Sequence, residues 1–138
     1  MFRKPAFLNH WLEGLKSKKS FGNEGEKFAA RYLKKQGFEI VESNYRCKIG
    51  ELDIVARKKG RIHFVEVKTR SFPATHGLPE ESVDFRKQRK ITQVAKWYIK
   101  DKKMTDISIS FSVLAVMRHP EGWQCKFIEN AFDAAEGV

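Results

Sequence analysis

Residues 51–68 have the sequence ELDIVARKKGRIHFVEVK, and this stretch decides the fold. Strand-like runs at 51–57 and 61–68 flank Lys59 and Gly60, a pattern that is typical of a β-hairpin. Glycine readily adopts the backbone conformation that a tight hairpin turn requires. The stretch therefore predicts two antiparallel strands joined through these two residues.

The register of this hairpin determines which side chains meet. With the turn centred on 59–60, Asp53 lies opposite Glu66 and Glu51 lies opposite Lys68. Because side chains alternate along a strand, both pairs share one face. That face would comprise Glu51, Asp53, Val55, Arg57, Ile62, Phe64, Glu66 and Lys68. The opposite face would form the core, from Leu52, Ile54, Ala56, Val65 and Val67. A slip of one residue would reverse both faces.

The facing carboxylates of Asp53 and Glu66 indicate a metal site. In this register their Cβ atoms are about 5 Å apart, and two like charges so placed destabilise a sheet unless they are compensated. A hard cation, Mg²⁺ or Mn²⁺, would compensate them, and Mg²⁺ keeps several waters that a phosphodiester hydrolase can use. Lys68 would hold the attacking water or stabilise developing phosphate charge. The alternative is a solvated strand face with a surface ion pair between Glu51 and Lys68.

Glu26 has two interpretations. Asn23 is a good helix N-cap, and Glu26 three residues later completes a capping box. In the other interpretation, Glu26 is a third carboxylate that points from the helix terminus toward the hairpin. The two roles are compatible.

The remaining elements follow from periodicity and from turn residues. They are a helix from Asn23 to about Gly37, a strand at 38–41, a loop at 71–79, a helix at 80–100 and strands at 107–117 and 123–128. This order predicts an α/β fold with a mixed central sheet flanked by helices.

Composition favours a single basic domain that binds a polyanion. The chain has 138 residues, of which 41% are hydrophobic, and Lys plus Arg outnumber Asp plus Glu by 27 to 17. Nucleic acid is the first expected partner of this +10 charge, an anionic membrane surface the second, and a merely solvated basic surface is the alternative. Cys47 and Cys125 form no metal or disulfide motif, which indicates reduced thiols in the cytoplasm. We expect no transmembrane segment and no signal peptide.

Three segments are expected along the chain. Residues 1–19 form an amphipathic helical extension with a basic linker, 20–134 form the main domain, and 135–138 form a tail. The apolar stripe of the extension would dock on the chain's own core, in preference to a partner or a membrane surface.

Several motifs carry a family resemblance. They are Gly25-Glu26, Ala29-Ala30, Tyr32-Leu33, Gly37-Phe38, Asn44-Tyr45-Arg46, Gly50 to Val55, Phe64 to Arg70, Gly77 to Val83 and Lys87-Gln88. With them, residues 22–133 resemble the YraN-like family of uncharacterised bacterial proteins. That family is assigned to the restriction-endonuclease-like PD-(D/E)xK superfamily, close to the Holliday junction resolvases. The resemblance implies an αβββαβ nuclease core.

The resemblance also implies roles for four residues. Asp53 and Glu66 would be the metal ligands, Lys68 the catalytic lysine, and Glu26 the helix glutamate of the resolvase-like branch. Two departures stand out: Leu52 replaces the proline before the aspartate, and Ser110-Phe111-Ser112 replaces the Arg-Phe-Asp of more usual relatives. The second departure puts full activity in doubt, since a fold does not guarantee its chemistry.

Nucleic acid would be held through its phosphates by polar and basic residues near the site. The expected contacts are Arg46, Lys48, Arg70, Arg86, Lys87, Gln88 and Lys90. Such contacts give salt-dependent affinity that is largely independent of base sequence.

The leading hypothesis is a Mg²⁺- or Mn²⁺-dependent endonuclease that acts on structured DNA. The second is a catalytically silent nucleic-acid-binding protein on the same scaffold, which Ser112 favours. The third is an adaptor that recruits a partner through residues 6–15. Resolvase-like relatives imply a homodimer.

Overall fold

A computed structural model of the chain describes residues 18–71 and 83–135. Its elements are α2 (Lys18–Lys35), β1 (Glu39–Cys47), β2 (Gly50–Lys58), β3 (Arg61–Ser71), α3 (Phe85–Asp101), β4 (Ser108–His119) and β5 (Gly122–Phe132). This order confirms the predicted α/β fold, with the αβββαβ core of the restriction-endonuclease type followed by one further strand.

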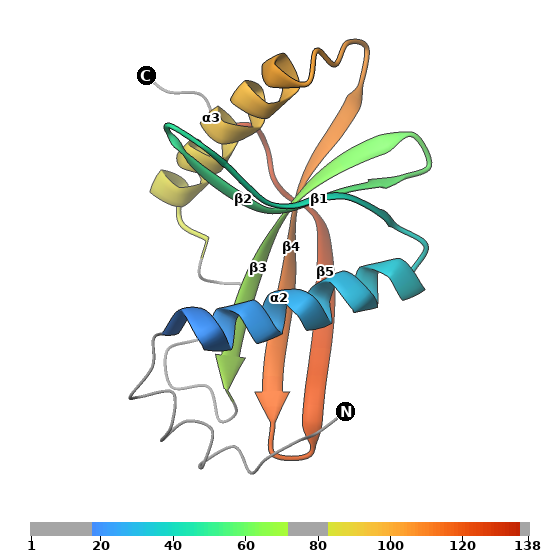
Figure 1. The fold of residues 1–138 in the computed structure, drawn as a ribbon, viewed down its shortest axis with the longest axis vertical. Helices are drawn as coiled ribbons and strands as arrows, with labels where there is room; N and C mark the ends of the chain where they lie inside the picture. Colours follow the sequence, from blue (N-terminus) through green and yellow to red (C-terminus); the bar gives the residue numbers. More distant parts are fainter. Residues whose placement is uncertain (1–17, 72–82, 136–138) are drawn as a thin grey trace.

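The sheet is mixed, as predicted. Its strands lie in the order β1-β2-β3-β4-β5, and every neighbouring pair is antiparallel except β3 and β4. A parallel pair needs a crossover, and α3 provides it. Figure 1 shows α2 lying across the lower strands and α3 at the other end of the molecule, beside β2.

Both faces of the sheet are buried, which corrects the expectation of one apolar and one polar face. Under α3, the core includes Val55, Ile62 and Phe64, which were expected on the polar face. Under α2, it includes Ile54 and Val65. The reason is that α3, the crossover helix, covers one face and α2 covers the other. A sheet with a helix on each side has no solvated face at its centre. The predicted site residues Asp53, Glu66 and Lys68 are therefore confined to one end of a buried face.

Leu52 also departs from strict alternation. It packs in the α3 cluster together with Val55, whereas Ile54 packs in the α2 cluster. β2 is thus irregular between Leu52 and Ile54, and Asp53 lies in this irregular stretch.

The predicted hairpin turn is confirmed. Lys59 and Gly60 have φ values of 51° and 74°, the positive values that a type I′ turn needs. Strand pairing runs from Lys58↔Arg61 to Ile54↔Val65 in the expected register.

The helix starts differ from the predictions. α2 begins at Lys18, so Asn23 lies inside the helix and the predicted N-cap, with its capping box, is wrong. The end of α2 is as predicted, because Gly37 has φ 93° and the Phe38 amide donates to the carbonyl of Leu33. α3 begins at Phe85, where the Asp84 side chain accepts a hydrogen bond from the Lys87 amide.

Part of the predicted extension lies outside the described residues. Residues 1–17 are not among them, while Lys18 and Lys19 already belong to α2. Within residues 18–71 and 83–135, no helix combines the length and the apolar character that crossing a membrane requires.

Candidate active site

The site lies where β2 parts from β3. The β2–β3 pairing ends at Ile54↔Val65. From there, β2 continues with β1 alone and β3 continues with β4 as far as Ser71↔Arg118. Figure 1 shows β2 turning toward α3 while β3 runs the other way under α2. Asp53 and Glu66 are the first residues beyond the last pair, at the point of the fork.

Asp53 replaces a missing main-chain acceptor at this fork. Its Oδ2 accepts a hydrogen bond of 2.8 Å from the amide of Val67, which has no cross-strand partner on β2. A buried N–H without a partner is costly, so this bond both stabilises the fork and fixes the carboxylate beside β3.

The neighbouring strand is also distorted at this level. Asn44 of β1, with φ 56°, lies between the pairs Ser43↔Ile54 and Tyr45↔Leu52. A hollow of about 370 Å³ opens there. Its lining residues are Glu26, Lys27, Ala30, Ser43, Asn44, Arg46, Asp53 and Ile54.

Glu66 lies among two ammonium groups. Its side chain is only 8% exposed, and its Oε2 is 3.6 Å from the Nζ of Lys68 and 3.4 Å from the Nζ of Lys87. Lys68 is on β3 itself, whereas Lys87 comes from the first turn of α3. The start of α3 therefore delivers a positive charge to the fork.

Glu26 reaches the same place from α2. Its half-buried side chain forms a hydrogen bond with Asp53. The preceding Gly25 is buried so close to β3 that a Cβ there would overlap Oγ1 of Thr69. The absence of a side chain at Gly25 thus lets α2 approach β3 and brings Glu26 to the fork. We call Glu26, Asp53, Glu66, Lys68 and Lys87 the fork cluster.

Burial and crowding hold a proton in the fork cluster. Burial and, to a lesser extent, the nearby Glu66 raise the pKa of Asp53 to about 8, against the opposing effect of the Val67 hydrogen bond. Burial likewise raises the pKa of Glu26. At neutral pH the carboxyl of Asp53 is therefore largely protonated.

The donor set fits a hard divalent cation that keeps most of its water. Within residues 18–71 and 83–135, no three side chains of His, Cys, Asp or Glu converge as a metal site. Two carboxylates with water in the other positions suit Mg²⁺ or Mn²⁺, which do not need a protein cage, and do not suit a structural zinc site. Such a cation would take the place of the proton on Asp53 and relieve its repulsion from Glu66.

The four residues predicted as catalytic are therefore gathered in one place, but not as simple cross-strand pairs. Glu51 does not face Lys68, because β2 has left β3 at that level. It forms an ion pair of 3.6 Å with Arg46 across the β1–β2 ladder instead. The alternative of a Glu51–Lys68 surface pair is thus wrong.

The predicted nucleic-acid contacts fall into two groups. Arg46 lines the hollow beside Asp53, and Lys87 belongs to the fork cluster. Lys48 and Arg86 are exposed, in the β1–β2 turn and at the start of α3 respectively.

The other three have local partners. Gln88 donates to the carbonyl of Val83, and the stem of Lys90 lies against Gly50. Arg70 donates to the carbonyl of Thr69, and its buried Nε has no hydrogen-bond partner among the described residues.

Sequence reasoning missed two parts of the site. The Val67 amide carries no sequence signal, because its role arises only where the strands part. Lys87 was predicted as a phosphate contact and not as a partner of Glu66. The available signal for its place in the site was its position near the start of the helix that follows the 71–79 loop.

The Ser112 hydroxyl contacts residues that do not belong to the fork cluster. Ser112 is fully buried, and its Oγ is 2.9 Å from Oγ of Ser110 and 3.4 Å from Nδ1 of His63. Because residues 110, 112 and 114 of β4 share a face, Ser112 points with Leu114 toward α2. The departure from Arg-Phe-Asp therefore alters the α2 side of the sheet.

Comparisons with known proteins agree on one family. The profile of the uncharacterised protein family UPF0102 matches residues 25–116, which include the whole fork cluster. A UPF0102 protein of Caldanaerobacter subterraneus is 47% identical over 105 residues, 76% of this chain and 85% of the relative. One from Clostridium acetobutylicum is 46% identical over 116 residues, 83% of this chain and 94% of the relative. The chain therefore belongs to the UPF0102 family, the YraN family that its motifs resemble.

Proposed function

We propose that this protein is a metal-dependent endonuclease that cleaves phosphodiester bonds in structured DNA. The observation that carries the proposal is the fork cluster: Asp53, held by the Val67 amide, lies beside the buried Glu66, with the ammonium groups of Lys68 and Lys87 within 4 Å of that carboxylate. Opposed charges in a partly water-excluded place are suited to phosphoryl chemistry.

Asp53 and Glu66 would hold the cation. When bound, Mg²⁺ or Mn²⁺ supplies a polarised phosphate and a water of lowered pKa. Lys68, whose side chain is 20% exposed and lies beside Glu66, would stabilise charge that develops on a phosphate oxygen. Glu26, which is hydrogen-bonded to Asp53, would keep that carboxyl oriented toward the cation.

Substrate would be held by charge. Arg46 at the hollow and the exposed Lys48 and Arg86 would contact the phosphates. Together with the net charge of +10, they predict affinity that falls steeply with salt.

A cleavage panel tests the proposal. The full chain is incubated with duplex, flap, four-way junction and single-stranded DNA in Mg²⁺, in Mn²⁺ and in EDTA, beside Asp53→Asn and the control Lys100→Gln on α3. We expect metal-dependent cleavage that Asp53→Asn abolishes and Lys100→Gln retains. Absence of cleavage on every substrate in both metals would refute the proposal.

A catalytically silent nucleic-acid-binding protein is the second candidate. One observation favours it: Glu66 already has two ammonium partners, and a protonated Asp53 leaves the fork cluster nearly neutral without any cation. This candidate predicts salt-dependent DNA binding that is the same in EDTA and in Mg²⁺ and is unchanged by Asp53→Asn.

A further inference from the structure

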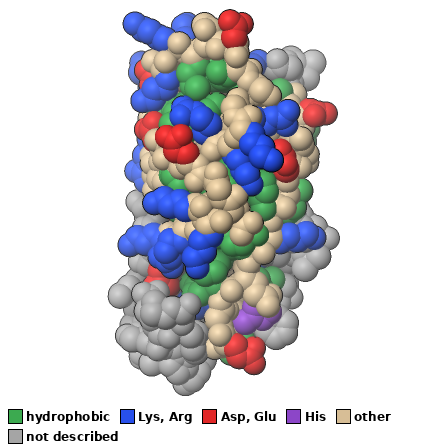
Figure 2. All heavy atoms as spheres, turned by 90° about the vertical axis from the view of Figure 1, so that its right-hand side faces the viewer, with side chains coloured by type: hydrophobic (Ala, Val, Ile, Leu, Met, Phe, Trp, Pro, Cys, Tyr) green, Lys and Arg blue, Asp and Glu red, His purple; other side chains and the backbone are tan. Residues whose placement is uncertain are grey.

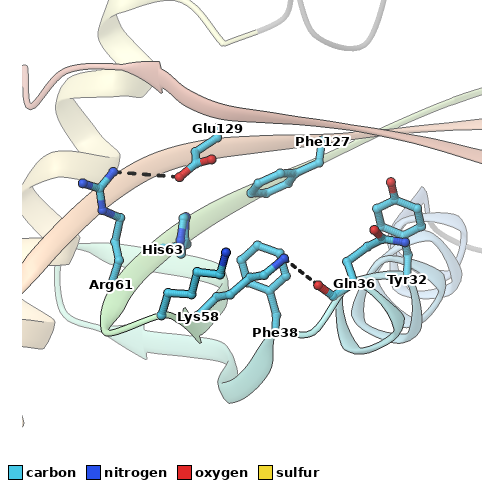
Figure 3. A pocket seen from close by; sticks show the side chains of 9 residues that line it. Tyr32, Gln36, Phe38, Lys58, Arg61, His63, Phe127 and Glu129 are labelled. Carbon is cyan, nitrogen blue, oxygen red and sulfur yellow. Dashed lines mark hydrogen bonds and ion pairs between the residues drawn. The ribbon is translucent and has the colours of Figure 1, made fainter.

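A second hollow lies at the far end of α2, near the β2–β3 turn. Its volume is about 310 Å³, at the lower end of the range for ligand sites and close to the size of one nucleotide. We call it the turn pocket. Figure 3 shows side chains from α2, the start of β1, the β2–β3 turn and β5 around it.

Aromatic rings form its walls. Phe38 and Phe127 meet edge to face with centroids 5.2 Å apart, and the ring of His63 lies 5.1 Å from that of Phe38. Tyr32 of α2 and Phe127 of β5 are only partly buried, so ring surface remains accessible. Accessible aromatic rings are the groups on which proteins stack nucleobases.

The rim of the turn pocket is mainly positive. Lys58, Lys59 and Arg61 line it, and Glu129 is the one acidic side chain among its lining residues. The Nζ of Lys58 lies 4.9 Å from the centre of the Phe38 ring, and Nη1 of Arg61 is 3.8 Å from Glu129. Figure 2 shows that the side of the molecule with the β2–β3 turn has Lys and Arg side chains spread among hydrophobic atoms, and fewer acidic ones.

His63 adds a polar group to the lining. It is 3% exposed, and within the described residues its ring has one hydrogen bond, which joins Nδ1 and Oγ of Ser112. Burial lowers the pKa of His63, so the ring is neutral at physiological pH. Its other nitrogen, Nε2, has no such bond among the described residues and can form a hydrogen bond with a ligand.

We infer that the turn pocket binds one nucleotide unit, with the base against the partly exposed rings of Tyr32 and Phe127 and the phosphate on Lys58, Lys59 and Arg61. Aromatic walls alone would suit any apolar ring, and cations alone would suit any anion. Their combination in a hollow of this size selects an aromatic group joined to a phosphate. The inference adds a site to the proposed function and does not depend on cation binding at the fork.

The nucleotide unit has two possible sources, a free nucleotide and a base of a nucleic-acid strand. Tyr32 and Gln36 follow Glu26 by six to ten residues on α2, which corresponds to about 9–15 Å at 1.5 Å per residue. A single strand that passes the fork cluster would thus reach the turn pocket within a few nucleotides.

Amide chemical shifts of the full ¹⁵N-labelled chain test the inference. The chain is titrated with deoxyadenosine 5′-monophosphate, with inorganic phosphate and with a single-stranded hexanucleotide, in EDTA. We expect saturable shifts at His63, Phe38 and Phe127 with the nucleotide or the hexanucleotide. Arg61→Gln should weaken binding about ten-fold, and Phe127→Leu, which keeps an apolar side chain, about five-fold or more. Lys100→Gln is the charge-matched control, and unfolding temperatures verify that each variant is folded.

The three ligands distinguish the possible results. Stronger shifts with the hexanucleotide assign the pocket to a strand, and equal or stronger shifts with the mononucleotide assign it to a free nucleotide; both support the inference. Shifts that phosphate alone reproduces at the same affinity would overturn it, as would no shift up to millimolar ligand or equal binding by Arg61→Gln and Lys100→Gln. Repeating the titration with Asp53→Asn keeps the two proposals apart, because that variant loses cleavage and retains the turn pocket.

Discussion

The two halves of the β2–β3 hairpin satisfy their backbone in different ways. In the turn half, residues 54–65, the strands pair residue by residue from Ile54↔Val65 to the Lys59-Gly60 turn. In the fork half, residues 51–53 and 66–70, the strands part, and the Asp53 side chain takes the acceptor role that a main-chain carbonyl would have. Regular pairing builds the core, and its interruption creates room for polar groups.

The difference between the two halves shows where a small sheet can hold buried charged side chains. A carboxylate at residues 54–56 or 62–65 of the turn half would have to lie in one of two packed cores, where an unpaired charge is costly. At the fork, an amide, two ammonium groups and a neighbouring carboxyl surround Asp53 and Glu66, so that burial is tolerated. The following variants separate the two halves, in order of decreasing effect.

Apart from Asp53→Asn, which removes a metal ligand, Lys68→Ala should give the largest loss of function. Removal of a fixed donor that stabilises developing charge typically costs about 10²–10³ in kcat. We expect cleavage to fall by that factor, while cation binding at Asp53 and Glu66 survives because the lysine is not a ligand. Single-turnover cleavage rates at saturating Mg²⁺ measure the loss. A rate within a few-fold of wild type would remove Lys68 from the mechanism.

The fork half should make the metal-free chain less stable at alkaline pH. The folded-state pKa of Asp53 is about 8, above its ordinary 3.8, so the folded chain holds an extra proton between these values. The associated stability is complete below about pH 4 and is lost as pH rises through about 8, an effect on the order of a few kcal/mol. Urea unfolding in EDTA from pH 5 to 9 measures it.

Asp53→Asn is the control for that experiment. Asparagine keeps an acceptor for the Val67 amide and has no titrating proton, so its stability should vary less over this range. A wild-type profile that matches the variant's would contradict the raised pKa.

Gly25→Ala tests how α2 reaches the fork. The new methyl group would overlap Thr69 Oγ1, and overpacking of this kind costs about 1–3 kcal/mol. The shift of α2 should also move Glu26 and lower cleavage. A double-mutant cycle with Thr69→Ala measures the coupling, and independent effects of the two changes would show that the contact does not position α2.

Gly60→Ala should have the smallest effect, because it alters only the turn half. Its φ of 74° strains any other residue by about 1 kcal/mol, while the added methyl group meets no atom within 4 Å. We expect slightly lower stability in urea and an unchanged cleavage rate. A loss of cleavage comparable to that of Lys68→Ala would show that the two halves are not separable.

The parts of the fold that were predicted from sequence depend on local signals. Lys59-Gly60 defined the hairpin and its register, and Gly37 marked the end of α2. The start of α2 at Lys18 has no such signal. β1 extends to Cys47, beyond the predicted 38–41, because its polar middle residues lie on an edge strand and hide the alternation.

The sequence predicted which residues form the candidate site, but it did not predict how they are arranged. The spacing of Asp53, Glu66 and Lys68 and the family resemblance identified them. The approach of Lys87 to Glu66 depends on where α3 packs, and the turn pocket depends on contacts between α2 and β5. Such long-range contacts leave no periodic trace in a single sequence.

Calorimetric titration of the metal-free chain with Mn²⁺ at pH 7 measures whether the fork cluster holds a cation. We expect one bound cation per chain, and we expect proton release, because the cation replaces the proton on Asp53. Comparison of two buffers of different ionisation enthalpy detects the released proton. Asp53→Asn should lose both the binding and the proton release, while Lys100→Gln keeps them. No binding at millimolar Mn²⁺, or the same isotherm for wild type and Asp53→Asn, would show that Asp53 does not hold a cation.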